Sequence, residues 1–206
     1  MLHGDFTETT AYSMIQLSDA YQRCDQLEQA VARLEHACTI LSTIETAAKE
    51  ADRPRITLQL NKTILQLVNI HLLIERVPEA EALTQKLEAR LETNLEDQFT
   101  FKLFNELGNT IRKHDNLAVA IQLYKKSLLS IKSRFKNTYL STRDTSKILI
   151  NIASTEYMRD NLQEALRYYE HALNVIRNCG ESAEKEDALE LKTLLADQAK
   201  VHVSIA

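Results

Sequence analysis

The stretch Ile150–Leu173, INIASTEYMRDNLQEALRYYEHAL, decides the fold class of this chain. Apolar residues recur at helical spacing on both sides of residues 160–161, which form a short polar break. Small residues stand where two helices would approach closely, with Ala153 before the break and Ala165 and Ala172 after it. The pattern predicts an antiparallel helical hairpin with a tight turn. One hairpin cannot bury both of its faces, so we expect neighbours of the same kind.

The hairpin pattern recurs three times upstream in the same register. With Ala165 as the anchor, the equivalent alanines at intervals of 45, 40 and 50 residues are Ala120, Ala80 and Ala30. Five residues before the anchors stand acidic residues suited to opening a helix, namely Asp160, Asp115, Glu75 and Asp25. Twelve before them stand small or modest residues, namely Ala153, Gly108, Val68 and Ser18, and thirteen before them Ile152, Leu107, Leu67 and Leu17. Four hairpins in register indicate a repeat protein.

This pattern resembles the tetratricopeptide repeat (TPR). The hallmarks of that repeat are a Leu-Gly pair on the first helix, then a small residue, an aromatic residue and another small residue on the second helix. The best match is Leu107-Gly108, Ala120, Tyr124 and Ser127. The resemblance covers about residues 11 to 178 and implies an all-α, right-handed TPR-like superhelix of four helical hairpins plus a C-terminal capping helix. The period of 40 to 50 residues exceeds the usual length of about 34.

The sequence divides into three predicted segments. Residues 1–10 are expected to form a flexible N-terminal arm, and residues 11–178 the four hairpins. We expect the second helices Leu27 to about Lys49 and Leu117 to about Phe135 to absorb the extra length of the repeats. After a helix stop at Gly180, residues 182–204 form an amphipathic pattern that predicts a helix capping the last hairpin.

The composition indicates a soluble, cytoplasmic helical protein. Only three glycines and two prolines occur in 206 residues, which disfavours a β-rich fold. No stretch approaches the roughly 18 apolar residues of a membrane helix, and the first thirty residues hold no unbroken apolar run. The three cysteines are odd in number and form no CxxC pair, so we expect buried or half-buried reduced thiols.

Patterns that would carry catalysis or bind a metal are missing from the sequence. The six histidines include no pair at i,i+3 or i,i+4, which a helical metal site would need. The chain has no GxSxG, no HExxH and no glycine-rich phosphate loop. We therefore expect a non-catalytic protein without a cofactor or a metal.

The TPR resemblance implies that the first helices of the hairpins line a concave groove. Asparagine amides offer a donor and an acceptor to a peptide backbone, and lysines neutralise carboxylates. The predicted peptide- or partner-binding residues are Lys62, Asn69, Lys102, Asn105, Asn109, Lys147 and Asn151. We predict that they bind a protein or an extended peptide segment. The alternative is that these side chains are only solvated.

Two TPR subgroups bear on the ligand. The long repeats and the groove asparagines are similar to those of the peptide-sensing regulators of Gram-positive bacteria (the RRNPP group). Those regulators often carry a helix-turn-helix domain ahead of the repeats, whereas only about ten residues precede them here, so such a regulator would act through a partner. The carboxylate clamp of chaperone-binding TPR proteins is matched in part by Lys147 and Asn151, but Leu65 and Asn105 stand where its first lysine is expected.

Basic residues are concentrated between Arg112 and Lys147. This stretch holds nine Lys and Arg against Asp115 and Asp144, which gives +7 in a chain whose net charge is -4. A solvated helix face, an acidic protein partner and nucleic acid are the three explanations. Nucleic acid is disfavoured, because few aromatic residues such as Tyr124 and Tyr139 are interleaved with the basic ones to form a stacking surface. The sequence specifies no oligomeric state.

Overall fold

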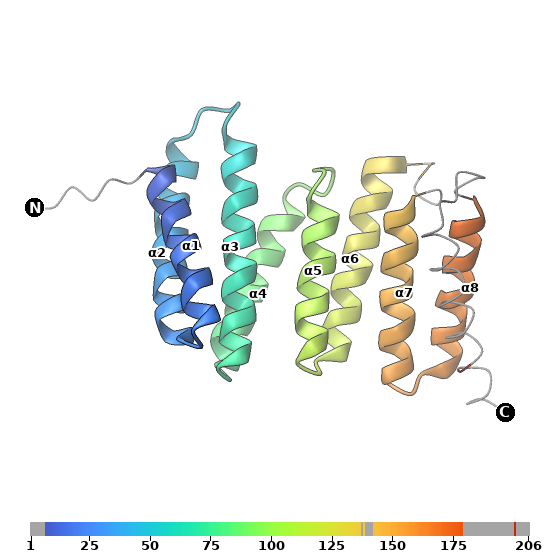
Figure 1. The fold of residues 1–206 in the computed structure, drawn as a ribbon. Helices are drawn as coiled ribbons and strands as arrows, with labels where there is room; N and C mark the ends of the chain where they lie inside the picture. Colours follow the sequence, from blue (N-terminus) through green and yellow to red (C-terminus); the bar gives the residue numbers. More distant parts are fainter. Residues whose placement is uncertain (1–6, 137, 139–141, 179–199, 201–206) are drawn as a thin grey trace, which may run out of the picture. The chain divides into compact units, whose positions relative to one another are not determined.

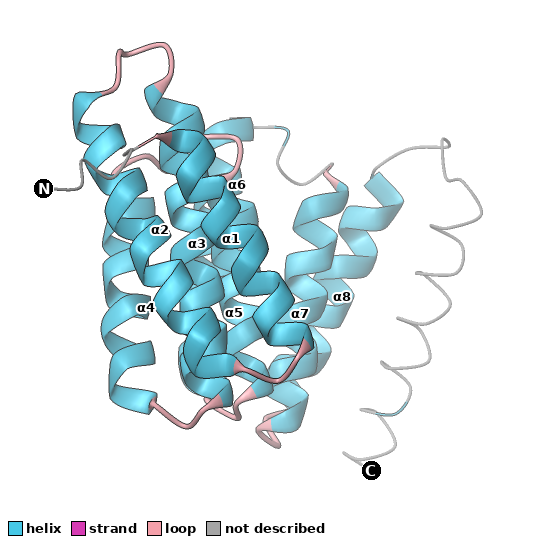
Figure 2. Cartoon of the chain, turned by 60° about the vertical axis from the view of Figure 1, so that its left-hand side comes forward, coloured by secondary structure: helices cyan, strands magenta, loops and turns pink. Residues whose placement is uncertain are grey.

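A computed structural model describes residues 7–136, 138, 142–178 and 200 (Figure 1). These residues form eight α-helices joined by loops, and no strand occurs among them (Figure 2). The helices are paired as four hairpins, so the predicted all-α hairpin architecture is confirmed. The predicted helix stop at Gly180 lies outside the described residues, and so does the predicted capping helix over residues 182–204, apart from Lys200.

The first compact unit ends at Thr93 and holds two hairpins. Its helices are α1 (Glu8–Arg23), α2 (Leu27–Ala47), α3 (Arg53–Leu73) and α4 (Val77–Glu92). Each helix packs against the next one along the chain. Helix α1 begins at Glu8 because the Thr7 hydroxyl accepts a hydrogen bond from the Thr10 backbone N–H, at 3.2 Å. Residues 8–10, which were predicted as part of a flexible arm, therefore belong to the first helix.

The second compact unit begins at Asn94 and holds the other two hairpins. Its helices are α5 (Thr100–Lys113), α6 (Leu117–Phe135), α7 (Arg143–Met158) and α8 (Leu162–Asn178). Asn116 and Thr142 cap α6 and α7 by accepting hydrogen bonds from backbone N–H groups three residues later. Helix α6 has the bounds predicted for the long second helix of this hairpin. Helix α7 packs against both α6 and α8.

The small residues of the repeat register are buried between the helices of each hairpin. The anchor residues Ala30, Ala80, Ala120 and Ala165 are at most 1% exposed. The residues twelve positions earlier, on the first helices, are buried as well; they are Ser18, Val68, Gly108 and Ala153. Burial at both positions of all four hairpins confirms the predicted register. Small side chains at these positions allow two helix backbones to approach closely.

Gly108 marks a close approach between α5 and α6. A Cβ atom at this position would lie 2.6 Å from Cε1 and 2.8 Å from Cδ1 of the Tyr124 ring. The Tyr124 side chain is fully buried, so the ring has little room to move. Hairpin four has Ala153 and Tyr169 at the equivalent positions, both buried. Hairpin four therefore also places a small residue and a tyrosine at these two positions, and both belong to one hydrophobic cluster.

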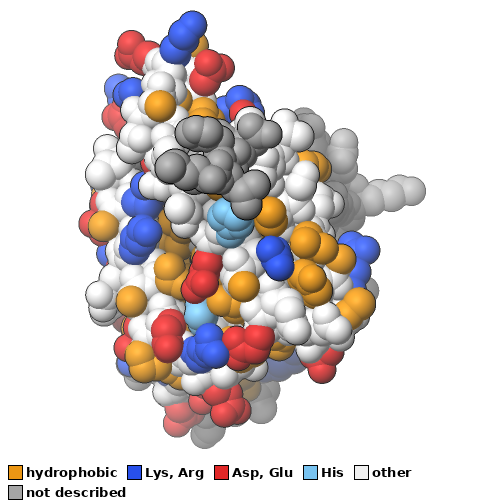
Figure 3. Space-filling view, turned by 90° about the vertical axis from the view of Figure 1, so that its left-hand side faces the viewer, with side chains coloured by type: hydrophobic (Ala, Val, Ile, Leu, Met, Phe, Trp, Pro, Cys, Tyr) orange, Lys and Arg blue, Asp and Glu red, His pale blue; other side chains and the backbone are white. Residues whose placement is uncertain are grey.

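One position of the register departs from the others at the start of the array. Ile152, Leu107 and Leu67 are at most 2% exposed, whereas the equivalent Leu17 is 40% exposed. Leu67 and Ile152 lie on helices that pack against the second helix of the preceding hairpin. Helix α1 has no preceding hairpin among the described residues, so this face stays open, and Tyr12 on the same helix is 59% exposed. Figure 3 looks onto this end of the first unit and shows hydrophobic side chains at its surface.

The acidic residues five positions before the anchors occupy the turn and do not cap the following helix. Asp25, Glu75, Asp115 and Asp160 have φ angles between 58° and 64°, in the left-handed region. In the first turn the Gln26 N–H donates to the Tyr21 carbonyl oxygen at 2.9 Å and the Asp25 N–H to the Gln22 carbonyl oxygen at 3.1 Å. These two bonds make a Schellman motif, which terminates a helix. The prediction that these residues open the second helix was therefore wrong. Each lies one residue before the N-cap, as Asp25 does before Gln26, the N-cap of α2.

The two described cysteines differ in environment. Cys38 on α2 is half-buried, and burial raises the pKa of its thiol to about 12. Cys24 follows α1 in the turn and is exposed, so the prediction that the cysteines are buried or half-buried was wrong for it. Its position in the sequence could have predicted this exposure, because Cys24 directly precedes the turn residue Asp25. Cys179 lies outside the described residues.

Replacing Gly108 by leucine should destabilise the protein. The added side chain must displace the Tyr124 ring, and overpacking of this kind costs about 1–3 kcal/mol, more than the gain of about 1 kcal/mol in helix propensity. Chemical denaturation of Gly108→Leu measures the change in the free energy of unfolding. Glu106→Leu on the exposed side of the same helix is the matched control and should change stability by less than about 0.5 kcal/mol. Equal stability of the two variants would mean that the helices do not meet at Gly108.

Replacing Glu75 by glycine should stabilise the protein. A non-glycine residue in the left-handed region costs about 1–2 kcal/mol, and part of this gain is offset by the greater freedom of glycine in the unfolded chain. We expect Glu75→Gly to raise the free energy of unfolding by about 0.5–1 kcal/mol, measured by thermal or urea denaturation. Glu79→Gly, inside α4, should lower it by about the same amount. A destabilised Glu75→Gly variant would contradict the observed turn.

The thiols should react at different rates in the folded protein. Only the thiolate reacts with maleimides and disulfide reagents, and a pKa of about 12 leaves Cys38 almost fully protonated at neutral pH. In a Cys179→Ser background, labelling followed by mass spectrometry should modify Cys24 at least about tenfold faster than Cys38. In denaturant the two rates should converge. Equal rates in the native state would show that the α2 thiol is not protected.

Candidate functional site

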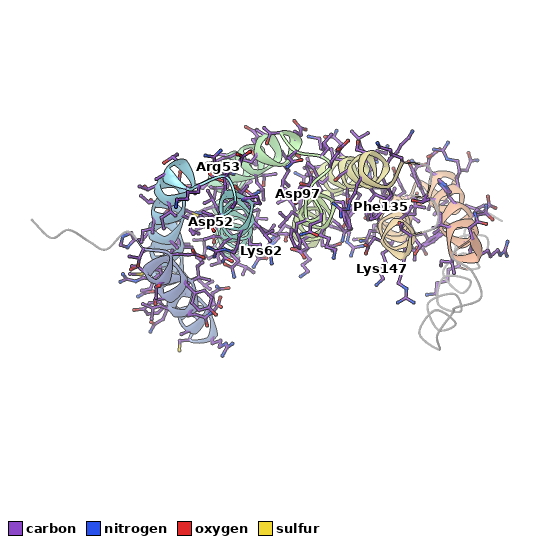
Figure 4. The ribbon with its side chains drawn as sticks, turned by 90° about the horizontal axis from the view of Figure 1, so that it is seen from above. Asp52, Arg53, Lys62, Asp97, Phe135 and Lys147 are labelled. Carbon is purple, nitrogen blue, oxygen red and sulfur yellow. The ribbon has the colours of Figure 1, made fainter. Side chains whose placement is uncertain are left out.

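The seven predicted binding residues are divided between the two units. Lys62 and Asn69 lie on α3 in the first unit; Lys102, Asn105 and Asn109 lie on α5, and Lys147 and Asn151 on α7, in the second. All seven are therefore on first helices of hairpins. The three lysines are exposed and the four asparagines half-buried. Figure 4 labels Lys62 on α3 and Lys147 on α7.

Two of the predicted asparagines are in direct contact. The Asn151 side-chain amide donates a hydrogen bond from Nδ2 to Oδ1 of Asn105, at 2.8 Å, and so joins α7 to α5. We call these two residues the amide pair. Each keeps hydrogen-bonding capacity, because Asn105 retains both Nδ2 protons and Asn151 retains Oδ1. Within the described residues no other side-chain hydrogen bond engages these atoms.

A second link lies one to two helical turns further along the same two helices. Nη1 of Arg112 on α5 donates to Oγ of Ser154 on α7, at 2.9 Å. The Ser154 hydroxyl in turn donates to the Asn151 carbonyl oxygen at 3.1 Å, and the Thr155 hydroxyl donates to the same oxygen at 2.6 Å. These contacts fix the α7 backbone around Asn151 relative to α5. The amide pair is therefore held in place without a ligand.

Asn109 makes a contact within its own hairpin besides its predicted binding role. Its Oδ1 atom accepts a hydrogen bond from the buried Tyr124 hydroxyl, at 2.8 Å. Burial raises the pKa of the Tyr124 phenol, and the positive charge of Arg112 opposes part of that increase. The phenol therefore stays protonated and acts as a donor. Because Asn109 supplies the acceptor for a buried hydroxyl, its side chain contributes to the core of hairpin three as well as to the α5 surface.

The predicted lysines of the second unit each lie about one helical turn before a member of the amide pair. Lys102 precedes Asn105 by three residues and Lys147 precedes Asn151 by four, so each lysine lies about one turn from an asparagine on the same helix face. The Lys102 ammonium lies 5.7 Å from the centroid of the Phe101 ring, a cation–π distance. The α5–α7 face thus combines an uncharged amide centre with two exposed cations.

A polar network in the first unit was not predicted. Arg90 on α4 donates from Nε to Oδ1 of Asn61 on α3, at 2.7 Å, and from Nη2 to Oε1 of Glu45 on α2, at 2.6 Å. The Thr57 hydroxyl also donates to Glu45 Oε1 at 2.6 Å. Burial alone would raise the pKa of the Glu45 carboxyl, but the hydrogen bonds from Arg90 and Thr57 outweigh it and hold the pKa below its ordinary value.

The same three helices border a cleft of about 440 Å³. It is lined by Leu60, Ile64 and Leu67 of α3, by Cys38 of α2 and by Lys86 of α4. Arg90 closes one part of the cleft and is already neutralised by Glu45. The cleft is lined by side chains of both signs, Glu35 and Lys86 among them. It therefore has no excess of one charge that would attract a charged ligand.

Among the described residues, no group of three or more His, Cys, Asp and Glu side chains gathers in an arrangement that could hold a metal ion. None of the helices in this part of the chain has the length and hydropathy that a bilayer crossing requires.

Comparison with known proteins agrees with the repeat register. A sequence model of the tetratricopeptide repeat matches residues 145–178, which are most of α7 and all of α8. No curated protein matches the sequence. Two crystal structures of TPR-like repeats from a kinesin light chain-like protein of Podosopora anserina, one of them a variant, are similar in structure.

The similarity to these two structures extends over nearly the whole chain. The variant has a TM-score of 0.65 at 15% identity and covers 96% of this chain and 90% of its own. The other structure has a TM-score of 0.58 at 14% identity and covers 97% and 99%. Identity at this level establishes the fold alone, a fold that commonly mediates protein–protein interactions. Residues 145–178 form a tetratricopeptide repeat, and the chain as a whole has the fold of the TPR-like repeat proteins.

Proposed function

We propose that this protein is a non-catalytic scaffold whose α5–α7 face binds an extended segment of a protein or a peptide. The observation that carries the proposal is the amide pair. Two asparagines on neighbouring first helices hydrogen bond to each other and keep a donor on Asn105 and an acceptor on Asn151. A peptide group presents one C=O and one N–H, and therefore needs one donor and one acceptor.

The chemistry of the pair suits the backbone of an extended ligand. A ligand carbonyl would accept from Asn105 Nδ2, and a ligand N–H would donate to Asn151 Oδ1. Backbone recognition of this kind does not depend on the ligand's side chains. Specificity would then come from the residues beside the pair, and the exposed Lys102 and Lys147 favour a ligand that carries carboxylates.

The face is organised before the ligand arrives. The contacts of Arg112, Ser154 and Thr155 fix the backbone at Asn151, and the amide pair fixes both side chains. Binding therefore loses little side-chain entropy, which otherwise costs about 0.5–1.5 kcal/mol for each immobilised side chain. We place this activity in the cytoplasm, a reducing compartment in which the free thiols of Cys24 and Cys38 are stable.

Removing either member of the amide pair should weaken binding without unfolding the protein. A peptide selected on the wild-type protein from a random-sequence library serves as the ligand. Asn105→Ala and Asn151→Ala should each weaken its binding at least about fivefold in calorimetry, because a ligand peptide group loses its partner. The double variant should bind about as weakly as each single one, since the two amides act as a unit. The melting temperatures should remain close to that of the wild type.

Two further variants make the test specific. Lys125→Ala on α6 removes a cation from a second helix and should leave binding of the selected peptide unchanged. Asn109→Ala is less suitable as a binding variant, because it leaves the Tyr124 hydroxyl without its acceptor and should lower stability. The proposal fails if the amide-pair variants bind normally and the Lys125 variant does not, because the working surface would then lie on the second helices.

A further inference from the structure

We propose that the exposed side of α1 is a self-association surface, on which a second copy of this chain docks to form an antiparallel pair with two-fold symmetry. The surface is a row of five exposed residues along the helix, which we call the α1 row: Thr9, Tyr12, Gln16, Ala20 and Arg23. The inference is independent of the amide pair, because it concerns a helix of the first unit and needs no peptide ligand.

The α1 row differs from the same side of the other first helices. Tyr12 is 59% exposed. Its equivalents in the repeat register on the other first helices are all exposed lysines, namely Lys62, Lys102 and Lys147. The row holds a single charge, at Arg23, in a chain in which 26% of the residues are charged. An exposed aromatic ring on a helix side with few charges is typical of the core of a protein interface.

The side of α1 next to the row is one that the repeat buries on other helices. Leu17 is 40% exposed, whereas its equivalents Leu67 and Ile152 are buried on α3 and α7, which pack against the second helices of the preceding hairpins. Ser13 on the same side donates its hydroxyl hydrogen to the Thr9 carbonyl oxygen at 3.0 Å, so a partner need not supply an acceptor for it. A helix docked on the row therefore also covers apolar surface at Leu17.

The spacing of the α1 row is the same when it is read from either end of the helix. Successive members are 3, 4, 4 and 3 residues apart, so the row is symmetric about Gln16. Two copies packed antiparallel across this point bring Tyr12 of each copy opposite Ala20 of the other. A large ring meets a small side chain at both places, and the row is thus complementary to itself, as the surface of a two-fold dimer must be.

The polar members of the row are also accommodated in the antiparallel pair. The two Gln16 side chains face each other, and an amide offers both a donor and an acceptor to an identical amide. Arg23 of each copy lies opposite Thr9 of the other, so the two arginines are about 21 Å apart along the helices at a rise of about 1.5 Å per residue. In a parallel pair the two Arg23 side chains would meet and repel each other, which favours the antiparallel arrangement.

A pair made by one helix from each copy is small. Helix α1 has 16 residues and is therefore about 24 Å long. Standard interfaces bury about 800 Å² on each partner, which is more than one helix of this length provides. We therefore expect a weak dimer, with a dissociation constant on the order of 10–100 µM, in exchange with the monomer.

Sedimentation velocity of the full chain tests the self-association. Over about 1–500 µM, a range that brackets the expected dissociation constant, the wild type should pass from monomer to dimer and form no larger species. Gln16→Glu and Gln16→Lys should each weaken dimerisation at least about tenfold, since like charges then meet at the centre of the pair. An equimolar mixture of these two variants should associate at least as tightly as the wild type.

An exchange of side-chain size tests the register of the pair. Tyr12→Ala leaves a gap and Ala20→Tyr crowds two rings, so each should weaken dimerisation at least about threefold. The double variant should dimerise like the wild type, because a large and a small side chain are again opposite each other. Gln122→Glu on α6 is the matched charge control and should leave dimerisation unchanged. All melting temperatures should stay close to that of the wild type, since the row is exposed in the monomer.

Three results would overturn the proposal. The first is a wild type that stays monomeric throughout the concentration range, because the α1 row would then face solvent or a different protein. The second is a dimer that the Gln16 variants leave unchanged, or a mixture of these variants that stays monomeric, because the copies would then meet on another surface. The third is growth beyond the dimer with rising concentration, because a two-fold surface is used up when two copies pair.

Discussion

The close approach of α5 and α6 at Gly108 is the contact on which the second unit depends. The Tyr124 ring fills the space that a side chain at Gly108 would need, and this places the Tyr124 hydroxyl within reach of Asn109. The orientation of α5 is thereby fixed from within its own hairpin. Helix α7, which packs on α6 and contacts α5, then meets α5 through the amide pair and through Arg112 and Ser154. A packing constraint inside one hairpin thus determines the polar surface between two hairpins.

The helices and their register could be predicted because they depend on local patterns. The spacing of small residues located the anchors Ala30, Ala80, Ala120 and Ala165, and all four are buried. Asp25 and its equivalents were predicted to open the second helices but lie in the turns before them. Residue type alone could not decide this, because an acidic residue before a helix can serve either as an N-cap or as a left-handed turn residue. Leu17 shares a register position with the buried Leu67 and Leu107 but is 40% exposed, because the register does not show that α1 lacks a preceding neighbour among the described helices.

The candidate site could be predicted only in part, because hydrogen-bond partners depend on three-dimensional packing. The register placed Asn105, Asn109 and Asn151 on first helices, which is where the structure has them. It did not show that Asn105 and Asn151 meet, or that Asn109 serves Tyr124. The network of Glu45, Asn61 and Arg90 was missed altogether, since its members come from three helices and share no motif.

The central claim is that the amide pair recognises a peptide backbone, and side-chain amide NMR tests it most directly. In a 15N-labelled sample the Nδ2 protons of Asn105 and Asn151 give resolved signals that report on their own hydrogen bonds. On titration with a peptide selected from a random library, we expect both signals to shift and the Asn105 protons to become protected from solvent exchange. The side-chain amide of Gln122 on α6 should not move. Unchanged Asn105 and Asn151 signals in the saturated complex would contradict the claim.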